Sequence, residues 1–165
     1  MSFIGNSGAE SAPRLAPAVP WESRLGQSQN ATNPDLKGLQ SRGGKLILYH
    51  GWSDPALSPL ATIDYYESVI AKMGAKDAAS FTRLYMVPGM QHCAGGPGPN
   101  SFGAQMRAAL EHWVEQKKAP QAIIASHATN GKVDRIRQLC PYPQVAKYKG
   151  SGSIDDAANF ACRMP

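Results

Sequence analysis

The sequence predicts an α/β fold built on parallel strands, and three consecutive stretches carry this prediction. Lys45 to Tyr49 and Phe81 to Val87 are short apolar runs, each followed by a turn that contains glycine, which is typical of buried strands. The stretch between them has the spacing of a helix. Two strands joined through a helix form a right-handed crossover, so the loops after both strands lie at one edge of a parallel sheet.

The composition is that of a single globular domain without an obvious charged or membrane partner. Among 165 residues, 42% are apolar, and the net charge of +5 comes from Lys and Arg that are scattered along the chain. We therefore expect no nucleic acid and no membrane as partner. Met1 to Glu10 lacks the apolar core of a signal peptide, so any export signal is expected to lie outside this chain.

The first 40 residues differ from the rest of the chain. Residues 1–40 are rich in Gly, Ala, Pro, Ser and Asn without a regular apolar period, which predicts an extended or disordered lead-in. Leu36 and Leu39 are expected to begin the packing against the sheet. The folded part should then comprise residues 41–165.

Two helices are expected to flank the strands. Ser58-Pro59 predicts the start of the first helix and Gly74 its end, followed by a polar connection from Lys76 to Ser80. Its apolar face comprises Ile63, Tyr66, Val69, Ile70 and Met73.

The second helix is predicted over Gly103 to Lys118 and should end at Pro120. Its apolar stripe comprises Met106, Ala109, Leu110, Trp113 and Val114, and Arg107 and Glu111 form an outward pair. Ala122 to Ser126 is a possible last strand, and the chain from Arg137 onward is expected to be irregular.

Two side chains on the loops after the predicted strands form the candidate site. Asp54 follows the first strand and His92 the second, at the edge where open α/β sheets carry their chemistry. Taken alone, Asp54 is a common turn former and His92 a solvent-exposed loop histidine. The 38 positions between them accommodate one helix and one strand, so the two side chains can converge.

Several motifs also carry a resemblance to a known family. HGWSDPALSPLATIDYY, RLYMVPGMQHCAGGPGPNSF, LCPYPQVAKYKGSG and DDAANFAC are similar to the C-terminal part of the tannase and feruloyl esterases, which are α/β-hydrolases. The resemblance covers residues 29–165. It implies that residues 41–165 form the C-terminal part of a catalytic domain, with parallel strands, flanking helices and a loop-rich tail tied by a disulfide. It also implies that Asp54 and His92 are the acid and base of a Ser-His-Asp triad.

The three cysteines leave one over, which indicates either reduced thiols or a thiol whose partner lies elsewhere. The resemblance pairs Cys140 with Cys162 and leaves Cys93 without its mate, which in the family lies beside the nucleophilic serine. Such a disulfide implies an oxidising compartment, and the family implies a secreted or periplasmic protein.

The nucleophilic serine itself is missing from the sequence. A nucleophile elbow needs glycine two residues before and after the serine, and Ser53 and Ser101 each have glycine on one side only. The resemblance places this serine and a large lid in an N-terminal part that has no counterpart here. The expected partners are that missing half and an aromatic ester substrate.

The preferred prediction is the C-terminal portion of a serine esterase that acts on feruloyl or galloyl esters and is inactive alone. The alternative is a non-catalytic binding or remnant domain. Trp52 is either part of a substrate pocket or a structural side chain. No cofactor is expected. We also expect no metal site, because His50, His112 and His127 lack regular spacing with Cys or acidic residues.

Overall fold

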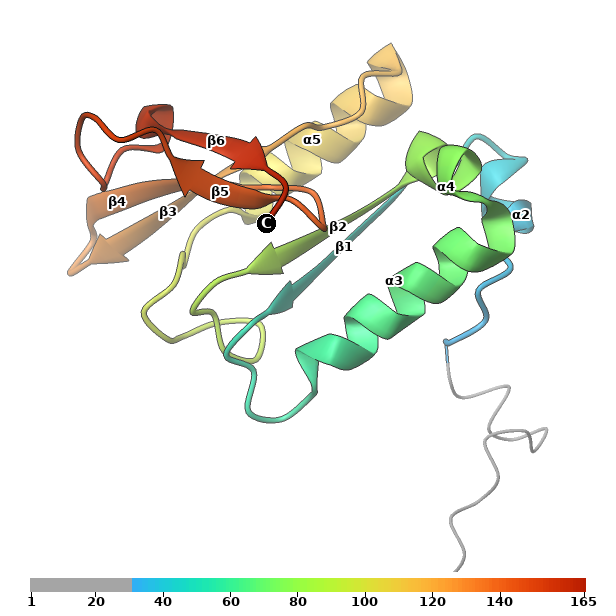
Figure 1. Cartoon of the computed structure of the whole chain (residues 1–165), viewed down its shortest axis with the longest axis horizontal. Coiled ribbons are helices and arrows are strands. Elements are labelled where there is room, and N and C mark those ends of the chain that lie inside the picture. The colour runs from blue at the N-terminus through green and yellow to red at the C-terminus, as the bar shows by residue number, and fades with distance from the viewer. Residues whose placement is uncertain (1–30) are drawn as a thin grey trace, which may run out of the picture. The chain divides into compact units, whose positions relative to one another are not determined.

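The computed structural model describes residues 31–165 (Figure 1). Most of the predicted lead-in, residues 1–40, and the segment Met1 to Glu10 discussed above therefore lie outside the described residues. The last four residues of that lead-in, Lys37–Gln40, form the short helix α2.

The two predicted strands pair in parallel. Strand β1 spans Leu46–Gly51 and β2 spans Thr82–Val87, with Leu46 opposite Thr82 and Gly51 opposite Val87. Helix α3, Pro59–Met73, begins at the predicted proline and has the predicted Gly74 as its C-cap, although the Ser58 side chain makes no capping hydrogen bond. The predicted crossover is therefore confirmed, and the loops after β1 and β2 lie at the same edge.

Helices α3 and α5 cover opposite faces of this strand pair. On one face, Ile63 and Tyr66 of α3 pack with Leu84 and Met86 of β2. The other face joins Tyr85 and Val87 of β2 to helix α5, Gly103–Gln116, and to strand β3, Ile123–Thr129. Successive strand residues point to opposite faces, so one strand serves both cores.

The connection between α3 and β2 was predicted wrongly. Instead of a polar linker over Lys76 to Ser80, the chain forms helix α4, Ala75–Phe81. Ala78 and Phe81, three residues apart, are buried against the C-terminal end of α3. Leu36 and Leu39 pack against this helical cluster, not against the sheet as expected.

Helix α5 is shorter than predicted, and its buried apolar face is narrower. It ends at Gln116 because Lys117 adopts the left-handed conformation (φ 58°), three residues before Pro120. Val114, assigned to the apolar stripe, is exposed to solvent. The expected surface pair of Arg107 and Glu111 is present, with Nε and Oε1 3.8 Å apart.

The C-terminal third contains more strand than predicted. Strand β3 is not the last: it pairs antiparallel with β4, Lys132–Leu139, through a turn in which Asn130 and Gly131 both have positive φ. Strands β5, Val145–Tyr148, and β6, Phe160–Arg163, form a second antiparallel hairpin, with the short helix η1, Ala157–Asn159, just before β6. The described part of the chain is thus mixed α/β with three two-stranded sheets.

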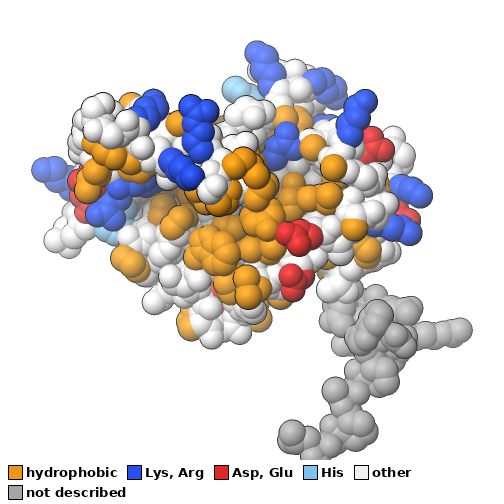
Figure 2. All heavy atoms as spheres, viewed as in Figure 1, with side chains coloured by type: hydrophobic (Ala, Val, Ile, Leu, Met, Phe, Trp, Pro, Cys, Tyr) orange, Lys and Arg blue, Asp and Glu red, His pale blue; other side chains and the backbone are white. Residues whose placement is uncertain are grey.

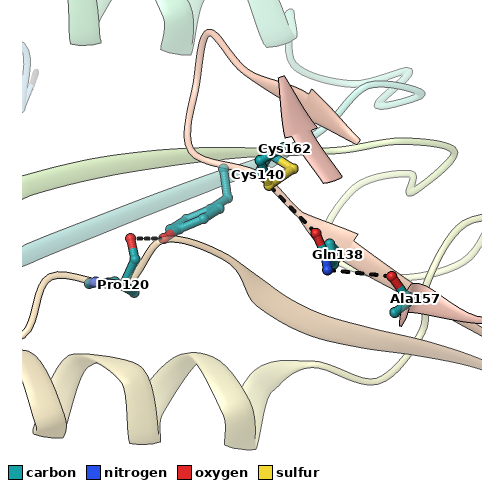
Figure 3. Close-up of a disulfide and its surroundings, with 6 residues drawn as sticks. Pro120, Gln138, Cys140, Ala157 and Cys162 are labelled. Atoms are coloured by element: carbon teal, nitrogen blue, oxygen red, sulfur yellow. Dashed lines mark hydrogen bonds between the residues drawn. A yellow bond between two sulfur atoms is a disulfide. The ribbon is translucent and has the colours of Figure 1, made fainter. Parts of the chain in front are cut away.

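A disulfide joins the C-terminal hairpin to the end of β4. It links Cys140 and Cys162, whose Cα atoms lie 5.5 Å apart (Figure 3). Beside it, the Gln138 side chain donates a hydrogen bond of 3.4 Å to the Ala157 carbonyl. These are the two cysteines that the family resemblance pairs. None of the helices in residues 31–165 is both long and apolar enough to cross a membrane.

Candidate active site

The candidate site begins where the two parallel strands run into their loops. Beyond the strands, the Trp52 N–H donates to the Val87 carbonyl at 2.9 Å, and the Ser53 N–H donates to the Met90 carbonyl at 3.0 Å. Gly51 makes this approach possible, since a Cβ atom at that position would overlap the Met90 carbonyl. The sheet pairing therefore holds the loops of Asp54 and His92 together.

The loop that carries His92 folds back on itself. The Gly98 N–H donates to the Gly89 carbonyl and the Gln91 N–H to the Gly95 carbonyl, both at 3.2 Å. Gly89 and Gly95 have positive φ, a conformation that glycine adopts without strain. These contacts fix the two ends of the loop and present His92 at its tip.

Asp54 and His92 meet at the rim formed by these loops. Nδ1 of His92 lies 2.8 Å from Oδ2 of Asp54. The Asp54 side chain is only 3% exposed, whereas that of His92 is 52% exposed. Since a carboxylate only accepts, Nδ1 of His92 carries the donated proton, which leaves Nε2 of the neutral ring as an acceptor. Within residues 31–165, no other side chain hydrogen-bonds this imidazole.

The second oxygen of Asp54 is held by the backbone. Oδ1 accepts the N–H groups of Leu57 at 3.0 Å and Ala56 at 2.8 Å. The pKa of Asp54 lies well below its ordinary value, and the largest cause is the hydrogen bond from the Leu57 N–H. The His92 imidazole and the Ala56 N–H lower the pKa further, and together these donors outweigh burial, which acts in the opposite direction. Asp54 therefore stays ionised over a wide pH range.

A second histidine, which sequence reasoning left without a role, also reaches Asp54. Nε2 of His50 lies 3.1 Å from Oδ2 of Asp54, and Nδ1 of His50 lies 2.6 Å from the Thr62 hydroxyl. His50 occupies the face of β1 that packs on α3, where its neighbour Leu48 also lies. Two features of the sequence indicate this contact. They are the alternation of side chains along the strand and the four-residue spacing from His50 to Asp54.

Trp52 and Cys93 lie close in sequence to Asp54 and His92. Trp52 is exposed and lines a cavity of about 650 Å³ together with Met86, Pro88 and Tyr142, whereas neither Asp54 nor His92 lines that cavity. In the space-filling view, apolar side chains gather at the centre of one face (Figure 2). Cys93 is an exposed free thiol directly after His92 and has a positive φ of 59°.

No metal-binding cluster comes together in the part of the chain that the structure describes. No group of three or more His, Cys, Asp and Glu side chains lies close enough there to hold an ion. His127 pairs with Asp134, with Nδ1 and Oδ1 2.7 Å apart, on the β3–β4 hairpin.

Comparisons with known proteins identify the family of the chain. The model of the family described as tannase and feruloyl esterase matches residues 19–163. The chain belongs to the tannase and feruloyl esterase family. Solved family structures have the same fold over most of the chain. Feruloyl esterase B from Aspergillus oryzae is similar with a TM-score of 0.73 and 31% identity, over 79% of this chain and 29% of that one.

Curated relatives in the family are hydrolases and esterases. Mono(2-hydroxyethyl) terephthalate hydrolase of Piscinibacter sakaiensis is 53% identical over 138 residues, which cover 82% of this chain and 22% of that protein. A probable feruloyl esterase of Arthroderma benhamiae is 34% identical, over 79% of this chain and 25% of its own length. The chain thus spans about a quarter of the length of these relatives.

Proposed function

We propose that this chain is the C-terminal part of a serine carboxylic ester hydrolase and supplies the acid and the base of its catalytic triad. The single observation that carries the proposal is the hydrogen bond from His92 to the buried carboxylate of Asp54. It leaves Nε2 of His92 without a partner among residues 31–165, at an exposed rim where a serine hydroxyl from outside these residues can reach it.

The proposed chemistry is acyl transfer in two halves. In the first, Nε2 of His92 takes the proton of the serine hydroxyl as the oxygen attacks the ester carbonyl, and returns it to the leaving alcohol. In the second, Nε2 of His92 takes a proton from water as the water oxygen attacks the acyl-serine carbonyl, and returns it to the serine oxygen as the acid is released. Asp54 fixes the imidazole tautomer and stabilises the imidazolium in both halves.

The proposed substrates are esters of aromatic carboxylic acids, of the feruloyl or galloyl type. The names of the relatives support this class, since they include a terephthalate monoester hydrolase and feruloyl esterases. The apolar cavity beside Trp52 offers a surface for an aromatic ring. The serine, the oxyanion donors and the lid are assigned to the part of the protein beyond this chain. The disulfide supports a secreted or periplasmic location.

A graft tests this proposal. Residues 29–165 would replace the matched region of the Piscinibacter sakaiensis hydrolase, which keeps its own remaining sequence, and release of aromatic acid from its ester would be measured. We expect turnover by the graft and a loss of at least about 10³-fold in the His92→Ala graft. The parent enzyme is the positive control, and the melting temperature of each graft verifies folding.

The chain alone provides the complementary measurement. Without an acyl acceptor or oxyanion donors, it should hydrolyse feruloyl and galloyl esters no faster than His92→Ala does. Robust turnover that His92→Ala abolishes would mean that a serine of this chain is the nucleophile. A folded graft that is no more active than its His92→Ala version would instead favour the alternative, a non-catalytic binding or remnant domain.

A further inference from the structure

Oδ2 of Asp54 lies between two imidazoles. His92 approaches it at 2.8 Å through Nδ1, and His50 approaches it at 3.1 Å through Nε2. Because Oδ1 accepts two backbone N–H groups, the carboxylate has four donors for its roughly four lone-pair sites. Asp54 is therefore fully satisfied, and two of its donors are histidines with different surroundings.

The contacts of His50 define its tautomer. An ionised carboxylate can only accept, so Nε2 of His50 carries the proton that Asp54 receives. In the neutral ring, Nδ1 is then an acceptor, and the Thr62 hydroxyl at 2.6 Å donates to it. Both nitrogens of His50 are thus occupied, whereas Nε2 of His92 has no hydrogen-bond partner among residues 31–165.

Burial separates the roles of the two histidines. The side chain of His50 is 12% exposed and lies between β1 and the first turns of α3, which contain Thr62. It has no free nitrogen to exchange a proton with a substrate. The Nε2–H group of His50 instead restrains Oδ2 of Asp54, the oxygen that accepts the hydrogen bond of His92. The two backbone N–H groups restrain Oδ1.

We propose that His50, oriented by Thr62, is a positioning residue that holds Oδ2 of Asp54 toward His92 and so maintains the Nδ1–H tautomer of His92. This inference rests on the proposed roles of Asp54 and His92 in ester hydrolysis. The inference extends these roles, because it makes Asp54 a member of a hydrogen-bonded chain of four residues. This chain runs from Thr62 of α3 through His50 and Asp54 to His92.

Nitrogen-15 NMR of this chain tests the proposal without any catalytic serine, because ring nitrogen shifts report which nitrogen is protonated. At about pH 8.5, where free imidazoles are neutral, we expect His50 as the Nε2–H and His92 as the Nδ1–H tautomer. His50→Phe keeps an aromatic side chain but removes the donor, and should lower the Nδ1–H fraction of His92 roughly two-fold or more. His50→Gln, whose amide can donate to Oδ2, should restore it.

Thr62→Val is the companion variant, since it keeps the side-chain shape and removes only the hydroxyl. It should give His50 a mixture of tautomers and shift His92 in the same direction as His50→Phe, which keeps the test valid if His50→Phe does not fold. An unchanged His92 tautomer in folded His50→Phe or Thr62→Val would overturn the proposal, as would a His50→Gln spectrum like that of His50→Phe. An inactive graft with these tautomer shifts present would count against the proposed function alone.

Discussion

Nδ1 of His92 lies 2.8 Å from Oδ2 of Asp54, although 38 positions separate the two residues in sequence. The approach follows from the parallel pairing of β1 and β2, which ends at Gly51 and Val87, and from the backbone hydrogen bonds that continue into both loops. The local sheet thus determines the geometry of the pair, and changes to the sheet edge should act on it directly.

Gly51→Ala should disrupt this edge. A Cβ atom there would overlap the Met90 carbonyl, so the loops must separate, at a cost of roughly 1–3 kcal/mol in the free energy of unfolding. Urea unfolding of the purified chain measures this change. Gly103→Ala is the matched control, because a Cβ atom at Gly103 meets no atom within 4 Å, and it should be neutral or slightly stabilising. Equal stability of both variants would argue against the close loop contact.

The disulfide should account for a large share of the stability of the C-terminal hairpins. Cys140→Ser with Cys162→Ser removes a bond that spans 22 positions, and should lower the free energy of unfolding by about 3 kcal/mol. Cys93→Ser, at an exposed free thiol, should have little effect. Thiol titration of the denatured protein should find one thiol before reduction and three after. Three thiols before reduction would contradict the pairing.

The lowered pKa of Asp54 predicts a specific loss of stability in acid. Since folding depresses the pKa below its ordinary value of 3.8, the ionised carboxylate contributes stability that is fully present above that value. This contribution is lost as the pH falls through the folded-state pKa. The difference in unfolding free energy between wild type and Asp54→Asn should therefore be constant above about pH 5 and shrink in stronger acid. A difference that does not change down to pH 2 would show that Asp54 titrates normally.

The sequence predicted the central strands, both long helices and the convergence of the two loops, since these depend on local periodicity and on the handedness of the crossover. Helix α4 was missed because its buried side, Ala78 and Phe81, becomes apparent only against the end of α3. Strand β4 was missed although Asn130-Gly131 is a strong hairpin signal, because its residues are mostly exposed and polar.

The candidate site was predictable only where residues follow strand ends. Asp54 and His92 met that condition, whereas His50 lies within β1 and its role depends on a hydroxyl of α3. The packing partners of a side chain inside a strand are set by tertiary structure, which no local pattern specifies. Family resemblance supplied the cysteine pairing, which three cysteines alone leave open.

A double-mutant cycle in the graft tests most directly whether Asp54 and His92 act as one acid–base unit. Hydrolysis of a feruloyl ester would be compared for the graft, Asp54→Asn, His92→Ala and the double variant, with folding verified for each. We predict that each single change lowers kcat by at least about 10³-fold and that the double variant is no slower than His92→Ala. Losses that multiply in the double variant would contradict the account, because they would mean that the two side chains act independently.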